Sequence, residues 1–309
     1  MNTNQIPLGE MLARFSDETA CKRFLEQRRW PDGIVKCPRC GHGPAYRLKA
    51  RPFHYLCKSG LTTGEAGGQV TCHRKNGYRF SVITRTVFEN TNYPLREWFR
   101  VIFFMLHAKK GMSAHQIHRM LGTGSYETAW YLCTRIRAAM VDEELPKLLG
   151  QVEIDEAFIG GKEKNKHWPK RDPKAYGGIG KARVIGAIAR KGNVVCRMLD
   201  DVGFDTYDKF VREVVSDKVS LVSTDKFHGF RHLHKTLPHE TVDHHKREYV
   251  RGVVHTQSIE SFWSLLKRGI MGSYHHVSKE YLPLYLNEFS FRFNNRHNPD
   301  IFDAIIANC

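Results

Sequence analysis

The sequence predicts an α/β protein in which a mixed sheet flanked by helices follows a small cysteine-rich module and a helical region. Three observations point to this class. Four cysteines gather between residues 37 and 72, apolar residues recur at helical spacing between 94 and 140, and strand patterns alternate with helix patterns after Gly150. With 309 residues, 41% of them hydrophobic, the chain can bury one large core or several small ones.

The balance of charges narrows the range of partners. Lys and Arg total 48 against 32 Asp and Glu, a formal net charge of +16, so the natural partner is a polyanion and nucleic acid is the first candidate. An anionic membrane is the alternative, but the sequence has no run of about 18 apolar residues and no separate basic amphipathic helix. The first residues also lack the features of a signal peptide. We therefore expect a cytosolic protein without membrane contacts.

The N-terminal part of the sequence predicts a short helical leader and a small module that a metal site stabilises. Residues 8–29 have the spacing of one or two short helices before a turn at 31–33. From Cys37 to about Thr86 the chain is rich in glycine, aromatic and basic residues. A module this small needs disulfides or a structural metal to be stable. Four of the eight cysteines lie here: Cys37, Cys40, Cys57 and Cys72. In a reducing compartment such a cluster favours a bound metal over disulfides.

The region between residues 94 and 140 predicts three helices. Two glycine-containing joints, 111–113 and 122–125, separate the helical patterns. A short helix, a tight turn and a longer helix carrying Arg135 and Arg137 are typical of a helix-turn-helix that binds DNA. A plain three-helix bundle fits this stretch equally well.

The C-terminal half has the element order of an RNase-H-like core. The patterns predict three strands, a helix, two further strands and two helices, at 151–159, 184–189, 194–199, 206–215, 219–223, 241–244, 258–268 and 278–292. The chain thus divides into a leader (1–34), the cysteine module (35–90), the helical region (91–148) and the core (149–309).

Three acidic residues of the core are candidates for metal-dependent chemistry. Asp155 ends the most strand-like segment and Asp225 follows a buried strand, and ligands of open α/β sheets bind at strand ends. Glu260 lies at the edge of an apolar helix stripe, with Lys267 seven residues later on the same edge. Phosphodiester transfer needs two Mg²⁺ ions, which a few carboxylates can hold. On spacing alone, other acids compete for this role: Glu153, Glu156, Asp200, Asp201 and Asp205.

A lysine-rich segment, residues 160–181, lies between the first two strands of the core. It is either a solvated loop or, if it lies beside the active site, a clamp for DNA phosphates. The basic residues that would form the clamp are Lys162, Lys164, Lys166, Lys170 and Arg171.

Four long strings carry a resemblance to a known family. In chain order they are VEIDEAFIGGKEKNKH (152–167), VSTDKFHGF (222–230), VHTQSIESFWSLLKRGIMGSYHHVS (254–278) and EFSFRFNNR (288–296). Together they resemble the prokaryotic insertion-sequence transposases that join a zinc-ribbon head to an RNase-H-like DDE core. The likeness extends from Cys37 to Arg296.

The resemblance implies roles for individual residues of the core. The family's three metal-binding acids match Asp155, Asp225 and Glu260, which would hold two Mg²⁺ or Mn²⁺ ions, and its trailing basic residue matches Lys267. Similar proteins often carry Asn where Gln257 stands; both are neutral amides, but Gln is one methylene longer. Further DNA contacts are expected from side chains around the third acid: His255, Gln257, Lys267 and Arg268.

The cysteine module also resembles the family, with one departure. CPRC (37–40) is a standard half of a zinc site, whereas the second half is stretched because 15 positions separate Cys57 from Cys72. The insert is rich in glycine and threonine and predicts a loop pushed out between two ligands that still meet. The resemblance implies one structural Zn²⁺ on the four cysteines, although His54 or His73 could replace one of the last two.

The family implies a transposase that binds the terminal inverted repeats of its element, nicks them with water to free 3′-OH ends and joins these ends to target DNA. Synapsis of both ends implies a homodimer or a higher oligomer, and the expected location is the nucleoid of a prokaryotic cytoplasm. Two alternatives remain from the sequence: a transposase-derived DNA-binding regulator without catalysis, and another RNase-H-like nuclease such as a resolvase.

Overall fold

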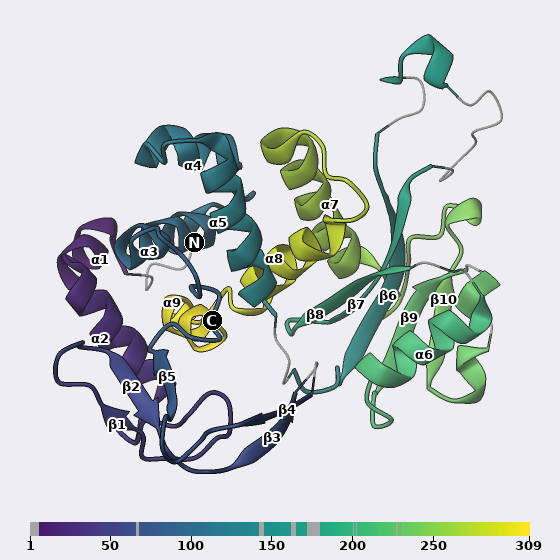
Figure 1. The fold of residues 1–309 in the computed structure, drawn as a ribbon. Coiled ribbons are helices and arrows are strands. Elements are labelled where there is room, and N and C mark those ends of the chain that lie inside the picture. The colour runs from purple at the N-terminus through teal and green to yellow at the C-terminus, as the bar shows by residue number, and fades with distance from the viewer. Residues whose placement is uncertain are drawn as a thin grey trace. The chain divides into compact units, whose positions relative to one another are not determined.

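A computed structural model describes residues 6–65, 68–141, 145–161, 165–171, 180–199, 201, 203–226, 228–230 and 232–309. The chain forms two compact units (Figure 1). The first contains Met1–His107, Ala114–Ala139 and Asn298–Cys309, and the second contains Ala108–Ser113 and Met140–His297. No helix in the described part of the chain is long and apolar enough to cross a membrane.

The first unit begins with the two short helices that the sequence predicts, α1 (Leu8–Arg14) and α2 (Glu18–Arg29). Helix α2 starts where the Asp17 side chain accepts a hydrogen bond from the Ala20 amide at 2.8 Å, which satisfies one of the free N–H groups of the first turn. An antiparallel sheet follows, with strand order β1 (Tyr46–Arg47), β2 (His54–Cys57) and β5 (Tyr78–Ser81).

The insert between Cys57 and Cys72 is a β-hairpin rather than the expected loop. Strands β3 (Thr62–Glu65) and β4 (Gly68–Thr71) pair antiparallel. The hairpin is closed at its base because the Gly60 amide donates to the Cys72 carbonyl at 2.7 Å and the Cys72 amide donates to the Leu61 carbonyl at 2.9 Å. A long insert can therefore separate two cysteines in sequence while keeping them close in space.

The remaining part of the first unit is helical. The three predicted helices are present as α3 (Leu95–His107), α4 (Ala114–Leu121) and α5 (Tyr126–Ala139). The turn between α4 and α5 contains Gly122 and Gly124 at φ of +60° and +64°, a left-handed backbone that glycine adopts without strain. A further helix at the C-terminus, α9 (Ile301–Ala307), packs on α2 and α3 and belongs to this unit, which the sequence patterns do not predict.

The second unit is built on a five-stranded mixed sheet (Figure 1). Its strand order is β10-β9-β6-β7-β8; β6, β7 and β8 are antiparallel, and β9 and β10 run parallel to β6. The bounds are β6 (Gln151–Ile159), β7 (Ala182–Ala189), β8 (Val194–Leu199), β9 (Leu221–Asp225) and β10 (His239–Val242). This sheet confirms the predicted RNase-H-like arrangement.

Helices cover both faces of the sheet. Helix α6 (Phe204–Val214) packs on the face that carries Val152 and Ile154, whereas α7 (Gln257–Gly269) and α8 (Leu282–Asn294) pack on the face that carries Ala157 and Ile159. Side chains of one strand alternate between faces, so the odd-numbered residues of β6 point towards α7. A small hairpin that the sequence patterns miss, β11 (Val250–Arg251) with β12 (Val254–His255), leads directly into α7.

Candidate active site and cysteine cluster

Strand pairing brings the first two candidate acids together. Strands β6 and β9 are parallel neighbours with Ile154 opposite Thr224, so the next residues in each strand, Asp155 and Asp225, lie side by side. The expectation that Asp155 ends its strand is wrong, because β6 continues to Ile159. It is β9 that ends here, at Asp225, and the sheet therefore opens beside Asp155.

The surroundings of Asp155 disfavour its charged form. Its pKa is raised to about 7, first by burial and then by the negative charge of Asp225, with a further contribution from Glu260. A neighbouring negative charge favours the protonated form of a carboxyl group. A divalent cation that binds between such groups stabilises them as anions. Asp225 and Glu260 thus both act electrostatically on Asp155, and carboxylate oxygens are the donors that Mg²⁺ prefers.

Trp263 and Gly186 position the Asp155 side chain. The indole Nε1 of Trp263 on α7 donates a hydrogen bond to Asp155 Oδ2 at 3.2 Å. Gly186 pairs directly opposite Asp155 in β7, and a Cβ there would meet the Trp263 ring at 2.6 Å. Glycine at this position therefore gives the indole room to lie over the sheet. Sequence reasoning missed both roles, because Trp263 reads as one more apolar residue of the helix stripe.

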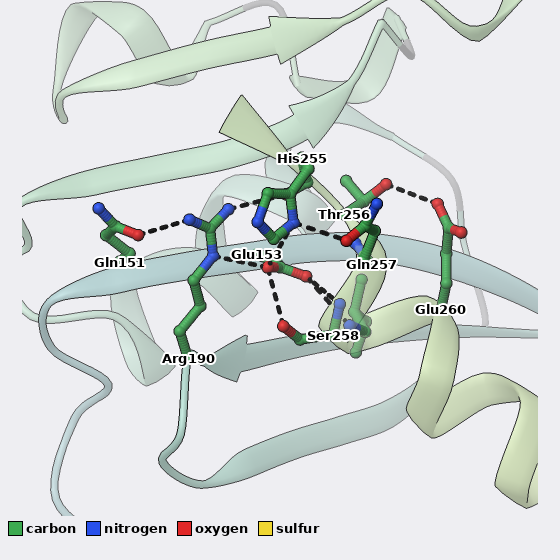
Figure 2. A network of polar contacts seen from close by, with 9 residues as sticks. Gln151, Glu153, Arg190, His255, Thr256, Gln257, Ser258 and Glu260 are labelled. Carbon is green, nitrogen blue, oxygen red and sulfur yellow. Dashed lines mark hydrogen bonds and ion pairs between the residues drawn. The ribbon is translucent and has the colours of Figure 1, made fainter. Parts of the chain in front are cut away.

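Glu260 lies in the first turn of α7, where Thr256 holds it (Figure 2). The Thr256 hydroxyl donates to Glu260 Oε1 at 2.7 Å, and Thr256 itself is 1% exposed. The hydroxyl fixes one carboxylate oxygen and leaves the other available to a ligand.

An open cleft of about 530 Å³ runs from the acids along α7. Asp155 and Glu260 line one part of it, and the exposed side chains of Lys267 and Arg268 line another. Lys267 thus lies in the same cleft as two of the acids, two helical turns beyond Glu260. A cleft with an acidic and a basic part can hold cations and phosphate groups together.

The competing acids lie elsewhere or have other partners. Glu153 is on the same face as Asp155 but is fully buried and accepts hydrogen bonds from the N-terminus of α7. Glu156 lines the cleft, points to the α6 face and pairs with Arg183 at 3.6 Å; burial raises its pKa. Asp205 is exposed in the first turn of α6. Asp200 lies outside the described residues.

Four cysteines of the first unit form a cluster. The Sγ atoms of Cys37, Cys40, Cys57 and Cys72 all lie within 4.8 Å of one another. The Cys37 to Cys72 distance is 3.9 Å and the Cys40 to Cys57 distance is 3.6 Å. Thiolates around a tetrahedral zinc ion lie about 3.8 Å apart, since each Zn–S bond is about 2.3 Å long. The donor set therefore fits a structural zinc, and neither His54 nor His73 belongs to the cluster.

The local environment favours a thiolate at Cys40. Burial raises the pKa of this thiol, but hydrogen bonds from the Ser59 hydroxyl, the His42 amide and the neighbouring thiols outweigh burial and lower the pKa to about 7. The turn around it is held by the Gly41 amide, which donates to the Cys37 carbonyl at 2.8 Å. Metal ligands must be deprotonated, a state that these hydrogen bonds favour at Cys40, whereas burial raises the pKa of Cys37 and of Cys72.

The expected DNA contacts differ in their surroundings. In the lysine-rich segment, Lys166 and Arg171 flank an exposed turn, Trp168–Lys170. Lys162, Lys164 and the side chain of Lys170 lie outside the described residues.

In the helical region, the expectation of a DNA contact at Arg137 does not fit a side chain that is 1% exposed. Arg135 donates to the carbonyls of Glu89 and Thr86. Beside the acids, His255 Nδ1 lies 3.2 Å from Glu153, whereas Gln257 is exposed at the start of α7.

The fold, the cleft and the cysteine cluster define the class of the protein: a mixed α/β core with carboxylates in an open cleft, accompanied by a zinc-ribbon-like cysteine cluster. Comparison with known proteins agrees. Residues 147–294 match the family model of the ISXO2-like transposase domain, and residues 16–59 match that of the transposase zinc-ribbon domain. The chain is thus similar to insertion-sequence transposases, with one region like their DDE domain and another like their zinc ribbon. The zinc-ribbon match ends before Cys72, which lies beyond the β3–β4 hairpin.

A relative from a mobile element supports this assignment. A protein of the transposable element ISH50 from Halobacterium salinarum is 28% identical over 292 residues, which cover 90% of this chain and 91% of that protein. The similarity thus includes both the cysteine cluster and the core.

Proposed function

We propose that this chain cleaves the ends of its own mobile element and joins them to target DNA, with Asp155, Asp225 and Glu260 as the metal-binding acids. The observation that carries this proposal is the placement of Asp155 beside Asp225 on paired strands, where burial and the charges of Asp225 and Glu260 raise the pKa of Asp155. Acids arranged in this way in an open cleft are suited to divalent cations and a phosphodiester substrate.

The reaction has two displacement steps at phosphorus. In the first, water attacks the phosphodiester at the element's end and the 3′ oxygen leaves, which produces a 3′-OH and a 5′-phosphate. In the second, this 3′-OH attacks a phosphodiester of the target, forms a new bond and releases a target 3′-OH. Two bound Mg²⁺ ions would activate the attacking oxygen and neutralise the leaving oxygen.

The residues of the cleft hold and orient the reacting groups. Asp155, Asp225 and Glu260 supply the carboxylate oxygens, and Thr256 and Trp263 fix the orientation of two of these side chains. Lys267 and Arg268 line the same cleft and would bind phosphates of the DNA that enters it. Catalysis then depends on positioning and charge neutralisation.

The first unit would bind the terminal inverted repeats. Zinc on the four cysteines would stabilise the ribbon, and α4 with α5 would form the helix-turn-helix. Both ends of an element must be held together for joining, so the active form would be a homodimer or a higher oligomer.

A plasmid assay tests the proposal. Supercoiled DNA that carries both ends of the element should be nicked at those ends when protein and Mg²⁺ are present. The Asp155→Ala variant should be inactive, whereas Asp205→Asn, a change at an exposed carboxylate on the opposite face of the sheet, should cleave like the parent. Equal cleavage by Asp155→Ala would refute the assignment of the active site.

A further inference from the structure

The N-terminus of α7 is capped by a residue far away in sequence. An N-cap side chain normally accepts a hydrogen bond from the second or third amide of its helix. Thr256 occupies the cap position of α7 but makes no such bond, and its hydroxyl donates to Glu260. The free amides are satisfied from β6: Glu153 Oε2 accepts from the Ser258 amide at 2.7 Å and from the Ile259 amide at 3.1 Å.

Glu153 is surrounded by donors (Figure 2). Its other oxygen, Oε1, accepts from Arg190 Nε at 2.7 Å and from the Ser258 hydroxyl at 3.0 Å, and the side chain is 0% exposed. Every one of these four contacts requires an acceptor, which an ionised carboxylate provides at both oxygens and a glutamine amide at only one. Arg190 compensates the buried charge, and the positive end of the α7 dipole favours the same anion.

The hydrogen bonds of Glu153 join the two chain segments that carry Asp155 and Glu260. Asp155 is two residues after Glu153 on the same face of β6, and Glu260 is two residues after Ser258 on α7. A second bond, from Trp263 to Asp155, holds α7 to β6 on the other side of Glu260. Helix α7 is thus fastened to the strand on both sides of Glu260.

We propose that Glu153 is a positioning residue: by capping α7 from β6 it fixes the first turn of α7, and with it Glu260, relative to Asp155. This inference rests on the proposed function of the three acids. On spacing alone, Glu153 competes for the role of a metal ligand. The inference instead gives it the role of holding the helix that carries Glu260. Loss of the cap should loosen the first turn of α7 and weaken divalent cation binding, with no ligand lost.

Two variants and a matched control test the inference. Glu153→Gln replaces one acceptor oxygen by a donor, and Glu153→Asp keeps the charge but retracts it by one methylene. Glu288→Gln is the control, because Glu288 is also 0% exposed in the second unit and pairs with Arg292 at 3.4 Å and with the Tyr274 hydroxyl at 2.8 Å. Should Glu153→Gln fail to fold, Glu153→Asp gives the same readouts.

Hydrogen exchange and Mn²⁺ binding give the decisive measurements. Both Glu153 variants should exchange the amides of Ser258 to Glu260 at least about tenfold faster than the parent, and calorimetry should show Mn²⁺ binding at least about tenfold weaker. Glu288→Gln should change neither. Exchange and Mn²⁺ affinity in the Glu153 variants equal to those of Glu288→Gln would overturn the inference.

The plasmid assay tests the proposed function independently of the exchange and Mn²⁺ measurements. A parent protein that binds Mn²⁺ but leaves plasmid DNA intact would refute the catalytic proposal. The effect of Glu153 on the α7 amides and on Mn²⁺ affinity would still decide the positioning role.

Discussion

At the residue scale, Asp155 links protonation to stability. Its pKa in the fold is about 7, against an ordinary value of 3.8, so the folded protein keeps a proton that the unfolded chain releases earlier. A raised carboxyl pKa means that stability is fully present below about pH 4 and is lost as the pH rises to about 7. The loss can reach about 4 kcal/mol at about 1.4 kcal/mol per pKa unit.

Thermal unfolding at several pH values tests this linkage. Without added divalent cations, the contribution of Asp155 should lower Tm progressively between pH 4 and 7, and Asp155→Asn should remove that contribution. Added Mg²⁺ should raise Tm at pH 8, where the acids are charged, more than at pH 5. A Tm difference between parent and Asp155→Asn that does not vary with pH would contradict the account.

Gly186 provides a second test at this scale. A methyl group there would meet the Trp263 ring at 2.6 Å, so Gly186→Ala should cost about 1 to 3 kcal/mol of stability through overpacking. It should also reduce DNA cleavage, because Trp263 would move from Asp155. Gly272→Ala is the matched control, since nothing lies within 4 Å of a Cβ at that position. Denaturant unfolding and plasmid cleavage check both expectations.

The sequence names the three acids as candidates but not the residues that hold them. Asp155, Asp225 and Glu260 stand at recognisable places in strand and helix patterns, and Lys267 follows from helical periodicity. Gly186 and Thr256 matter because of strand register and hydrogen bonds between distant segments, which no local pattern contains. Buried Glu153 looks like one more candidate acid until its partners are known.

At the element scale, the β3–β4 hairpin separates Cys57 and Cys72 in sequence but leaves both in the cysteine cluster. Because Gly60, Leu61 and Cys72 close its base through backbone hydrogen bonds, the hairpin can be removed above that base. A variant with a short Gly-Ser linker in place of residues 62–71 should retain one zinc per chain. Metal analysis of the purified protein measures this directly.

Replacing a cysteine of the cluster should have the opposite effect from removing the hairpin, because it should release the zinc. Cys72→Ser should lose zinc and lower the stability of the first unit, because metal binding is coupled to folding in such small modules. Cys309→Ser, a change outside the cluster, should keep the zinc. Full zinc occupancy in Cys72→Ser would show that another side chain completes the site.

Elements with long periodic patterns are predicted well, and short or inserted ones are not. The strand 151–159 and the helices of the 94–140 region appear as expected because many residues repeat one period. Two short hairpins and α9 are missed, since a few residues of strand, or one short terminal helix, carry too little pattern to separate them from loops.

At the scale of the whole molecule, the net charge of +16 predicts DNA binding that depends strongly on salt. Each phosphate contact releases counterions, so the logarithm of affinity should fall linearly with the logarithm of salt concentration. If Lys166 and Arg171 both contact phosphates, replacing both by Ala should reduce this slope by about two. An unchanged slope would exclude these two residues as phosphate contacts.

The central claim is that Asp155, Asp225 and Glu260 together catalyse strand joining. The direct measurement uses a short duplex of the element's end with a free 3′-OH, supercoiled target DNA and Mg²⁺. The parent and Asp205→Asn should join the duplex to the target, whereas Asp155→Asn, Asp225→Asn and Glu260→Gln should each lower joining by several orders of magnitude while still binding the duplex. Joining at the parental rate by any of these three variants would contradict the account.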